Sequence, residues 1–187
     1  MINAAVFASG EGTNAENLFR YFANDPRIRF KLVITNNEHA GVVERANRYK
    51  KSVHILSRES LQKYSSQLVE FLKVEQIDLI ILAGFLLKIP DEFIRAFPGR
   101  IINIHPSLLP KYGGKGMYGH HVHEAVIANH EKESGVTVHL VNEHYDEGEI
   151  ILQAKCHIAP GETAESLSKK IRDLEFECLP RAVEAFL

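Results

Sequence analysis

Short apolar runs alternate with helical patterns over the first 105 residues, and this alternation limits the folds open to the chain. The predicted strands cover residues 2–8, 30–35, 53–55, 78–82 and 100–105. The predicted helices between them cover residues 15–22, 42–49, 60–74 and 91–97. Helices of this kind are the crossovers that join parallel strands. The sequence therefore predicts an α/β fold: a Rossmann-like, open, mostly parallel twisted sheet with helices on both faces.

The pattern changes after residue 110. Residues 111–119 contain four glycines and no hydrophobic periodicity, which predicts a mobile loop that could close as a lid. The elements predicted beyond this loop are a helix, two strands and a terminal helix, at residues 122–129, 135–141, 150–158 and 163–186. The two strands are expected to pair as an antiparallel hairpin at the sheet edge. Pro180 is expected to interrupt the terminal helix.

The length and composition favour one globular domain over residues 1–187. The hydrophobic fraction is 45%, and 187 residues are enough to bury one good core. We expect residues 1–110 to form a phosphate- and substrate-binding half. Residues 111–187 would supply the lid loop, the hairpin and the terminal helix. The formal net charge of −2 argues against a nucleic-acid or membrane-surface binder, which would carry a basic face.

The sequence favours a cytoplasmic location. The N-terminus lacks the charged start and long apolar region of a signal peptide. No apolar run approaches the roughly 18 residues that span a bilayer. The two cysteines, Cys156 and Cys178, lie far apart and without metal-ligand spacing, so we expect two free thiols in a reducing compartment.

The strand at 100–105 places two polar side chains two residues apart, Asn103 and His105. Alternate side chains of a strand share a face, and Pro106 should end the strand. An amide and an imidazole would then meet at the carboxyl end of a strand, where open α/β sheets bind ligands. Imidazole can act as a general acid, and an amide can stabilise the same developing oxyanion. A structural, buried histidine is the alternative.

Asp146 lies in the predicted hairpin loop, in front of Glu147 and Gly148. A carboxylate close to His105 would orient the imidazole and raise its pKa. The alternative is an aspartate that only shapes the turn.

The loop at residues 9–14, Ser-Gly-Glu-Gly-Thr-Asn, leads into a predicted helix. Backbone N–H groups at a helix N-terminus favour an anion, and glycine allows its close approach. The loop lacks the third glycine of a dinucleotide fingerprint and the lysine of a P-loop. It is therefore either a phosphate site or a plain turn, with Thr13 or Asn14 as the helix cap.

His120, His121 and His123 form a dense group, but carboxylate or cysteine partners are absent at ligand spacing. We expect no metal there and interpret the group as exposed imidazoles at a helix start. Covalent catalysis is not indicated either, because the chain has no Gly-x-Ser-x-Gly elbow and no cysteine in a reactive context.

Taken together, the motifs resemble the phosphoribosylglycinamide formyltransferases, a branch of the folate-dependent formyltransferase family. The resemblance runs almost from end to end. The segments that carry it are 10–14, 83–85, 103–110, 135–139 and 146–153. It implies transfer of the formyl group of 10-formyltetrahydrofolate to the amine of 5′-phosphoribosylglycinamide, a step of purine synthesis. Direct attack by the amine would give a tetrahedral oxyanion.

The resemblance also implies roles for single residues. Asn103 and protonated His105 would stabilise the oxyanion, and Asp146 would hold His105 and assist proton transfer. The residues expected to bind the phosphoribosylglycinamide are Gly12, Thr13, Asn14 and Glu175. The residues expected to contact the folate are Leu86, Leu87, His139 and Asp146. Leu87 stands where many relatives have arginine, and the 111–119 loop is richer in glycine than theirs.

Two other functions compete with this interpretation. One is formyl transfer to another amine, such as an amino-sugar nucleotide. The other is a non-catalytic nucleotide-binding module, which would leave Asn103, His105 and Asp146 without a shared purpose. In each case we expect small-molecule ligands, no nucleic acid, no membrane and no metal, in a monomer or homodimer.

Overall fold

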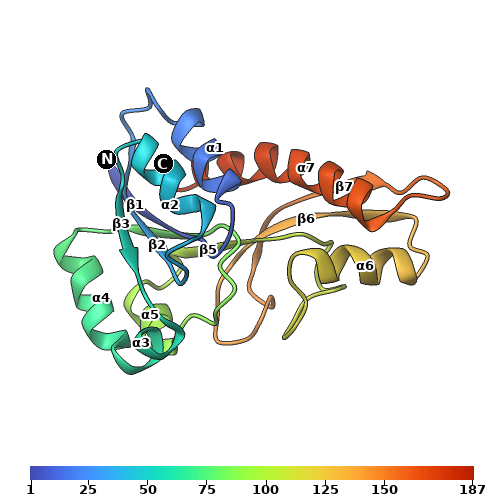
Figure 1. The fold of residues 1–187 in the computed structure, drawn as a ribbon. Coiled ribbons are helices and arrows are strands. Elements are labelled where there is room, and N and C mark those ends of the chain that lie inside the picture. Colours follow the sequence, from blue (N-terminus) through green and yellow to red (C-terminus); the bar gives the residue numbers. More distant parts are fainter. The chain divides into compact units, whose positions relative to one another are not determined.

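The computed structural model describes residues 1–187, and the chain divides into two compact units. The first unit holds residues 1–102 together with Leu187, and the second holds residues 103–186. The boundary falls within strand β5 (Ile101–His105), so each unit contains part of this strand. Figure 1 follows the chain from the first unit into the second by colour.

A parallel sheet forms the centre of the first unit. Its strands are β1 (Ile2–Phe7), β2 (Ile28–Thr35), β3 (Ser52–Ile55) and β4 (Leu79–Leu82). They are hydrogen-bonded in the order β3-β2-β1-β4, and all three pairs are parallel. All four residues of β4 and the last four of β1 are buried. This burial on both faces explains why these strands are continuous apolar runs rather than alternating ones.

Five helices accompany this sheet: α1 (Thr13–Tyr21), α2 (Gly41–Arg48), α3 (Arg58–Lys63), α4 (Ser65–Val74) and α5 (Asp91–Ala96). Helix α1 packs against α2, and α4 packs against α5. Figure 1 shows the first pair on one side of the sheet and the second pair on the other. The core between helices and sheet includes the fully buried side chains of Leu18, Leu72 and Phe93.

Two predicted details of this unit are wrong. The single helix expected at 60–74 is two helices, because the backbone leaves helical geometry at Tyr64 (φ −116°, ψ 27°). Tyr64 is followed by two serines, and both residue types are weaker helix formers than alanine or leucine. The cap of α1 is Gly12, in the left-handed conformation, rather than Thr13 or Asn14.

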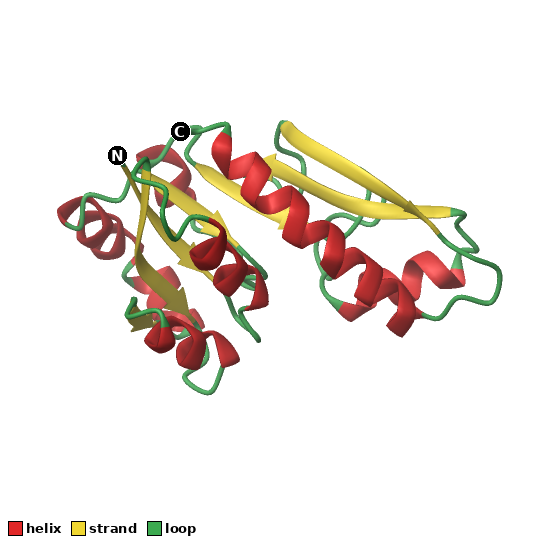
Figure 2. Ribbon diagram, turned by 90° about the horizontal axis from the view of Figure 1, so that it is seen from above, coloured by secondary structure: helices red, strands yellow, loops and turns green.

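The second unit contains the end of β5, β6 (Glu133–Leu140), β7 (Ile150–His157), α6 (His120–Ala128) and α7 (Ala164–Glu184). Its strands follow the order β5-β6-β7, and β6 and β7 are antiparallel. Helix α7 packs on α6, β6 and β7, and Figure 2 shows it lying along the strands. The predicted α/β class, with a mostly parallel sheet and an antiparallel C-terminal pair, is confirmed.

The predicted interruption of the terminal helix is wrong. Helix α7 runs for 21 residues through Pro180. A proline inside a helix removes one backbone hydrogen bond and crowds the preceding turn. Here Pro180 lies between buried neighbours, Leu179 and Ala182, so packing of the helix outweighs that local cost. No helix of the structure is both long and apolar enough to cross a membrane.

The β6–β7 pairing leaves no room for a side chain at Gly135. A Cβ there would lie 2.0 Å from the Ala154 carbonyl oxygen and 2.6 Å from a Leu108 methyl group. Overpacking typically costs about 1–3 kcal/mol. Gly135→Ala should therefore lower the free energy of unfolding, measured by urea titration, by about this amount. Gly10 has open space around its Cβ position, so Gly10→Ala is the matched control. Equal midpoints for both variants would contradict the close packing.

Candidate active site

Two chain segments bring polar side chains to the end of β5. The first is β5 itself, which ends at His105, as Pro106 predicts. His105 is only 4% exposed, and Asn103 is half-buried. The second is the β6–β7 connection, which carries Asp146. Asp146 adopts a left-handed backbone conformation (φ 56°), which aspartate tolerates better than most residues.

Gly148 makes this connection compact. A Cβ at Gly148 would lie 1.7 Å from the Leu140 carbonyl oxygen, so only glycine fits. The two ends of the connection therefore approach closely just beyond Asp146. The glycine of the Asp-Glu-Gly sequence is therefore required by the close packing of the backbone.

Three side chains converge around the Asp146 carboxylate. His105 Nδ1 lies 3.6 Å from Asp146 Oδ2. His139 Nε2 lies 3.6 Å and Asn103 Nδ2 3.5 Å from Asp146 Oδ1. Asn103 Nδ2 is also 3.1 Å from His139 Nε2. We call Asn103, His105, His139 and Asp146 the Asp146 cluster.

Backbone carbonyls fix the proton positions on both imidazoles of the cluster. A carbonyl oxygen can only accept, so the ring nitrogen that faces it carries the hydrogen. His139 Nδ1–H donates to the Leu140 carbonyl (2.8 Å), which leaves Nε2 to accept from Asn103. His105 Nε2–H donates to the Tyr112 carbonyl (2.7 Å). The Nδ1 atom of His105 is therefore the nitrogen that faces Asp146.

The glycine-rich loop at 111–119 packs on the cluster through its backbone. The Gly114 N–H donates to Asp146 Oδ2 (2.8 Å). A Cβ at Gly113 would lie 2.6 Å from a Leu109 methyl group and 3.2 Å from Asp146 Cβ. The adjacent glycines thus let the loop approach Asp146 closely enough to donate a backbone hydrogen bond.

The pKa of His105 is lowered below its ordinary value of 6.5, although Asp146 was expected to raise it. Burial is the largest cause, because it disfavours the charged ring, and the nearby His139 lowers the pKa further. Asp146 and the hydrogen bond to Tyr112 act in the expected, upward direction, but burial outweighs them. His105 therefore starts mostly neutral at pH 7.

The pKa of Asp146 is also lowered. Burial alone would raise it, but the His139 and His105 rings in their charged forms, together with the Gly114 N–H, favour the anion more strongly. Asp146 is therefore a carboxylate throughout the neutral pH range.

His120, His121 and His123 differ in exposure and do not form one cluster. His120 and His121 are exposed, and both lie close to the Glu124 carboxylate, at 3.2 and 3.5 Å. His123 is buried, which corrects the expectation of an exposed imidazole, and burial is the main cause that lowers its pKa to about 4. No three His, Cys, Asp or Glu side chains are arranged to hold a metal ion.

The remaining predicted binding residues lie on other segments. Gly12 precedes α1 with φ 72°, and a Cβ there would lie 2.5 Å from Val42. Thr13 and Asn14 are the first residues of α1. Leu86 is exposed and Leu87 half-buried in the segment after β4, where the Leu86 N–H donates to Ser9 Oγ (2.9 Å). In the second unit, Glu175 lies half-buried on α7.

Two contacts to the cluster were missed by sequence reasoning, the Tyr112 carbonyl and the Gly114 N–H. Both are backbone groups, which every residue carries. The Gly113-Gly114 pair was the available signal, since adjacent glycines allow close backbone approach.

The charge of Asp146 supports protonation of His105, so its removal should lower the His105 pKa further. We expect Asp146→Asn to move the midpoint of the His105 ring resonances, followed by NMR titration, to lower pH. Glu133→Gln is the control, because Glu133 is an exposed carboxylate of the same unit that pairs with Lys155. An unchanged His105 midpoint in Asp146→Asn would show that the two groups do not interact.

Comparisons with known proteins identify the family of the chain. The formyl transferase family model matches residues 2–183. A chloroplastic phosphoribosylglycinamide formyltransferase of Arabidopsis thaliana is 38% identical over 97% of this chain and 64% of its own length. The Haemophilus influenzae phosphoribosylglycinamide formyltransferase is 33% identical over 100% of this chain and 87% of its own length.

Solved structures show that the similarity includes the fold. The glycinamide ribonucleotide transformylase 1 of Geobacillus kaustophilus has a TM-score of 0.90 at 35% identity, covering 100% of this chain and 99% of that one. The chain spans less than two thirds of the plant relatives, 64% of one and 59% of another. With a family model that covers nearly every residue, the chain belongs to the formyl transferase family.

Proposed function

We propose that this chain transfers the formyl group of 10-formyltetrahydrofolate to the amine of 5′-phosphoribosylglycinamide. The products are formylglycinamide ribonucleotide and tetrahydrofolate, and the step belongs to purine synthesis. Relatives with this name, at 33–38% identity, support the choice of substrates. The observation that carries the chemistry is the Asp146 cluster. It places the Asn103 amide nitrogen and the His105 Nδ1 atom 3.5 and 3.6 Å from the oxygens of one carboxylate.

The cluster fits direct transfer without a protein nucleophile. The substrate amine attacks the formyl carbon, and the carbonyl electron pair moves onto oxygen. The Asn103 amide N–H can donate to that oxyanion. Neutral His105 can take the proton that the attacking amine loses, at Nδ1, which carries no hydrogen in the neutral ring. The proton then passes to the folate nitrogen as the carbon–nitrogen bond breaks.

This order of events replaces the expectation that His105 starts protonated. A group whose pKa is lowered by burial is a base at neutral pH, and it becomes an acid once it has taken a proton. Asp146 stabilises the imidazolium that forms, because the carboxylate lies 3.6 Å from Nδ1. Through this cycle His105 moves a proton from the attacking nitrogen to the leaving one.

We further propose binding roles for residues outside the cluster. Gly12, Thr13 and Asn14 lie at the N-terminus of α1, where free backbone N–H groups favour the substrate phosphate. Glu175 would bind the glycinamide end. Leu86, which is 51% exposed, offers an apolar contact for the pterin, together with Leu87. His139 would act beside the pterin through its contact with Asn103.

The proposal predicts formyl transfer from the folate to glycinamide ribonucleotide, measured by the absorbance change of the folate. His105→Ala and Asn103→Ala should each lower kcat roughly a hundredfold or more, the scale of losing a general base in the first case and an oxyanion partner in the second. Lys155→Ala, at an exposed ion pair of the same unit, is the control. Near-normal turnover in either cluster variant would reject its role. Activity with an amino-sugar nucleotide alone would reject the substrate.

A further inference from the structure

The carbonyl that holds His105 belongs to a chain segment that is itself firmly held. Thr137 donates its hydroxyl to the Ser107 carbonyl (2.7 Å) and accepts from the Leu109 N–H (3.1 Å). The Ser107 hydroxyl donates to the Lys111 carbonyl (2.6 Å). The Gln153 amide donates to the Leu109 carbonyl (3.1 Å). Side chains from β6 and β7 thus hold the backbone at Ser107 and Leu109, and the Ser107 hydroxyl holds it at Lys111, directly before Tyr112.

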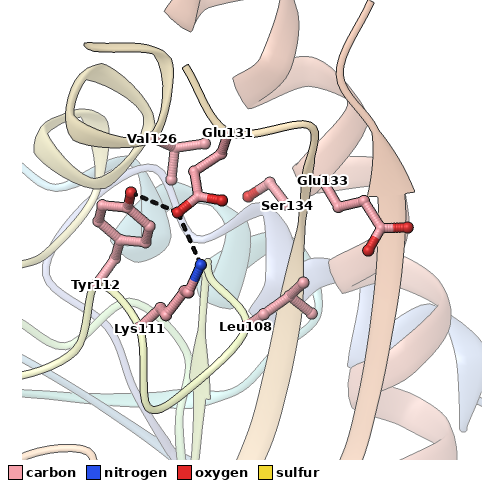
Figure 3. Close-up of a pocket in the computed structure, with 7 residues that line it drawn as sticks. All are labelled: Leu108, Lys111, Tyr112, Val126, Glu131, Glu133 and Ser134. Carbon is pink, nitrogen blue, oxygen red and sulfur yellow. Dashed lines mark hydrogen bonds and ion pairs between the residues drawn. The ribbon is translucent and has the colours of Figure 1, made fainter. Parts of the chain in front are cut away.

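Glu131 holds the next residue by its side chain. Figure 3 shows Lys111 and Tyr112 pointing toward the same carboxylate. The Tyr112 hydroxyl donates to Glu131 Oε1 (3.0 Å), and Lys111 Nζ lies 2.9 Å from the same oxygen. These hydrogen bonds lower the pKa of Glu131, so it is an anion that accepts at neutral pH. Glu131 lies between α6 and β6, outside the Asp146 cluster.

Tyr112 needs this support. Its backbone is left-handed (φ 57°), an unfavourable conformation for a bulky side chain. Such a conformation persists only where surrounding contacts determine it. Tyr112 has such contacts at both ends. Its hydroxyl donates to Glu131, and its carbonyl accepts a hydrogen bond from His105 Nε2–H (2.7 Å).

We propose that Tyr112 and Glu131 are positioning residues for His105. The Glu131–Tyr112 pair sets the Tyr112 carbonyl, and this carbonyl keeps the hydrogen of the neutral ring on Nε2. Nδ1 is thereby kept free to accept a proton on the side of Asp146 and Asn103. Without the pair, the nearby Asp146 carboxylate would favour a hydrogen on Nδ1, and this atom could no longer accept the proton of the substrate amine.

The first test measures the ring directly and does not require activity. In ligand-free protein above the His105 pKa, ¹⁵N-detected NMR of the histidine rings should show only the Nε2–H form of His105. Tyr112→Phe and Glu131→Ala should each show a mixture with the Nδ1–H form. The titratable groups that face His105 are Asp146, His139 and His123, and all three remain in these variants.

The second test is kinetic and rests on the proposed function. Each variant should lower kcat roughly 3- to 10-fold, the scale of one hydrogen bond, while KM for both substrates stays within about twofold. Because the two residues act as one pair, the double variant should lose no more than the larger single loss. Glu133→Gln is the control: Glu133 lines the same pocket as Tyr112 and Glu131, but it pairs with Lys155.

The outcomes separate the two proposals. If the wild-type protein lacks formyl transfer, the proposed function fails, and the ring spectra still decide the positioning role. An unchanged His105 spectrum in both variants overturns that role, even if kcat falls. Additive losses of kcat in the double variant also overturn it, because the residues would then act separately. Melting curves of each variant confirm that it is folded when measured.

Discussion

One half-buried negative charge organises the polar interior of the second unit. The Asp146 carboxylate lies against two imidazoles and an amide, and it accepts a backbone hydrogen bond from Gly114. A buried charge is costly unless partners compensate for lost hydration. Here the partners do more than compensate, since the pKa of Asp146 is lowered in spite of burial. The same charge therefore stabilises the cluster and supports protonation of His105.

Opposing effects act on the pKa of His105. Burial disfavours its charged form, while Asp146 and the Tyr112 carbonyl favour it, and burial prevails. A ring that is neutral at rest, with a carboxylate beside its free nitrogen, suits a proton carrier in acyl transfer. Neither burial alone nor Asp146 alone would give a ring that is neutral at rest and stabilised once it has taken a proton. The reactivity that we propose is a property of the cluster and of the loop that packs on it.

The sequence was informative where local patterns decide the structure. Apolar alternation predicted the parallel sheet, and the spacing of Asn103 and His105 placed both at the end of β5. Local sequence left Asp146 as a turn residue, and only the resemblance brought it to His105. The direction of the His105 pKa was beyond prediction, because it depends on burial by segments distant in sequence. The uninterrupted course of α7 through Pro180 also depends on tertiary packing, which overrides the local preference.

The central claim is that Asn103 and the Nδ1 atom of His105 act on one formyl group beside Asp146. The most direct measurement is a crystal structure with glycinamide ribonucleotide and a folate analogue that cannot transfer its formyl-like carbonyl. We predict that Asn103 Nδ2 lies within about 3.2 Å of the carbonyl oxygen, and that His105 Nδ1 faces the substrate amine. A carbonyl bound away from Asn103, or an amine facing Nε2 of His105, would contradict the account.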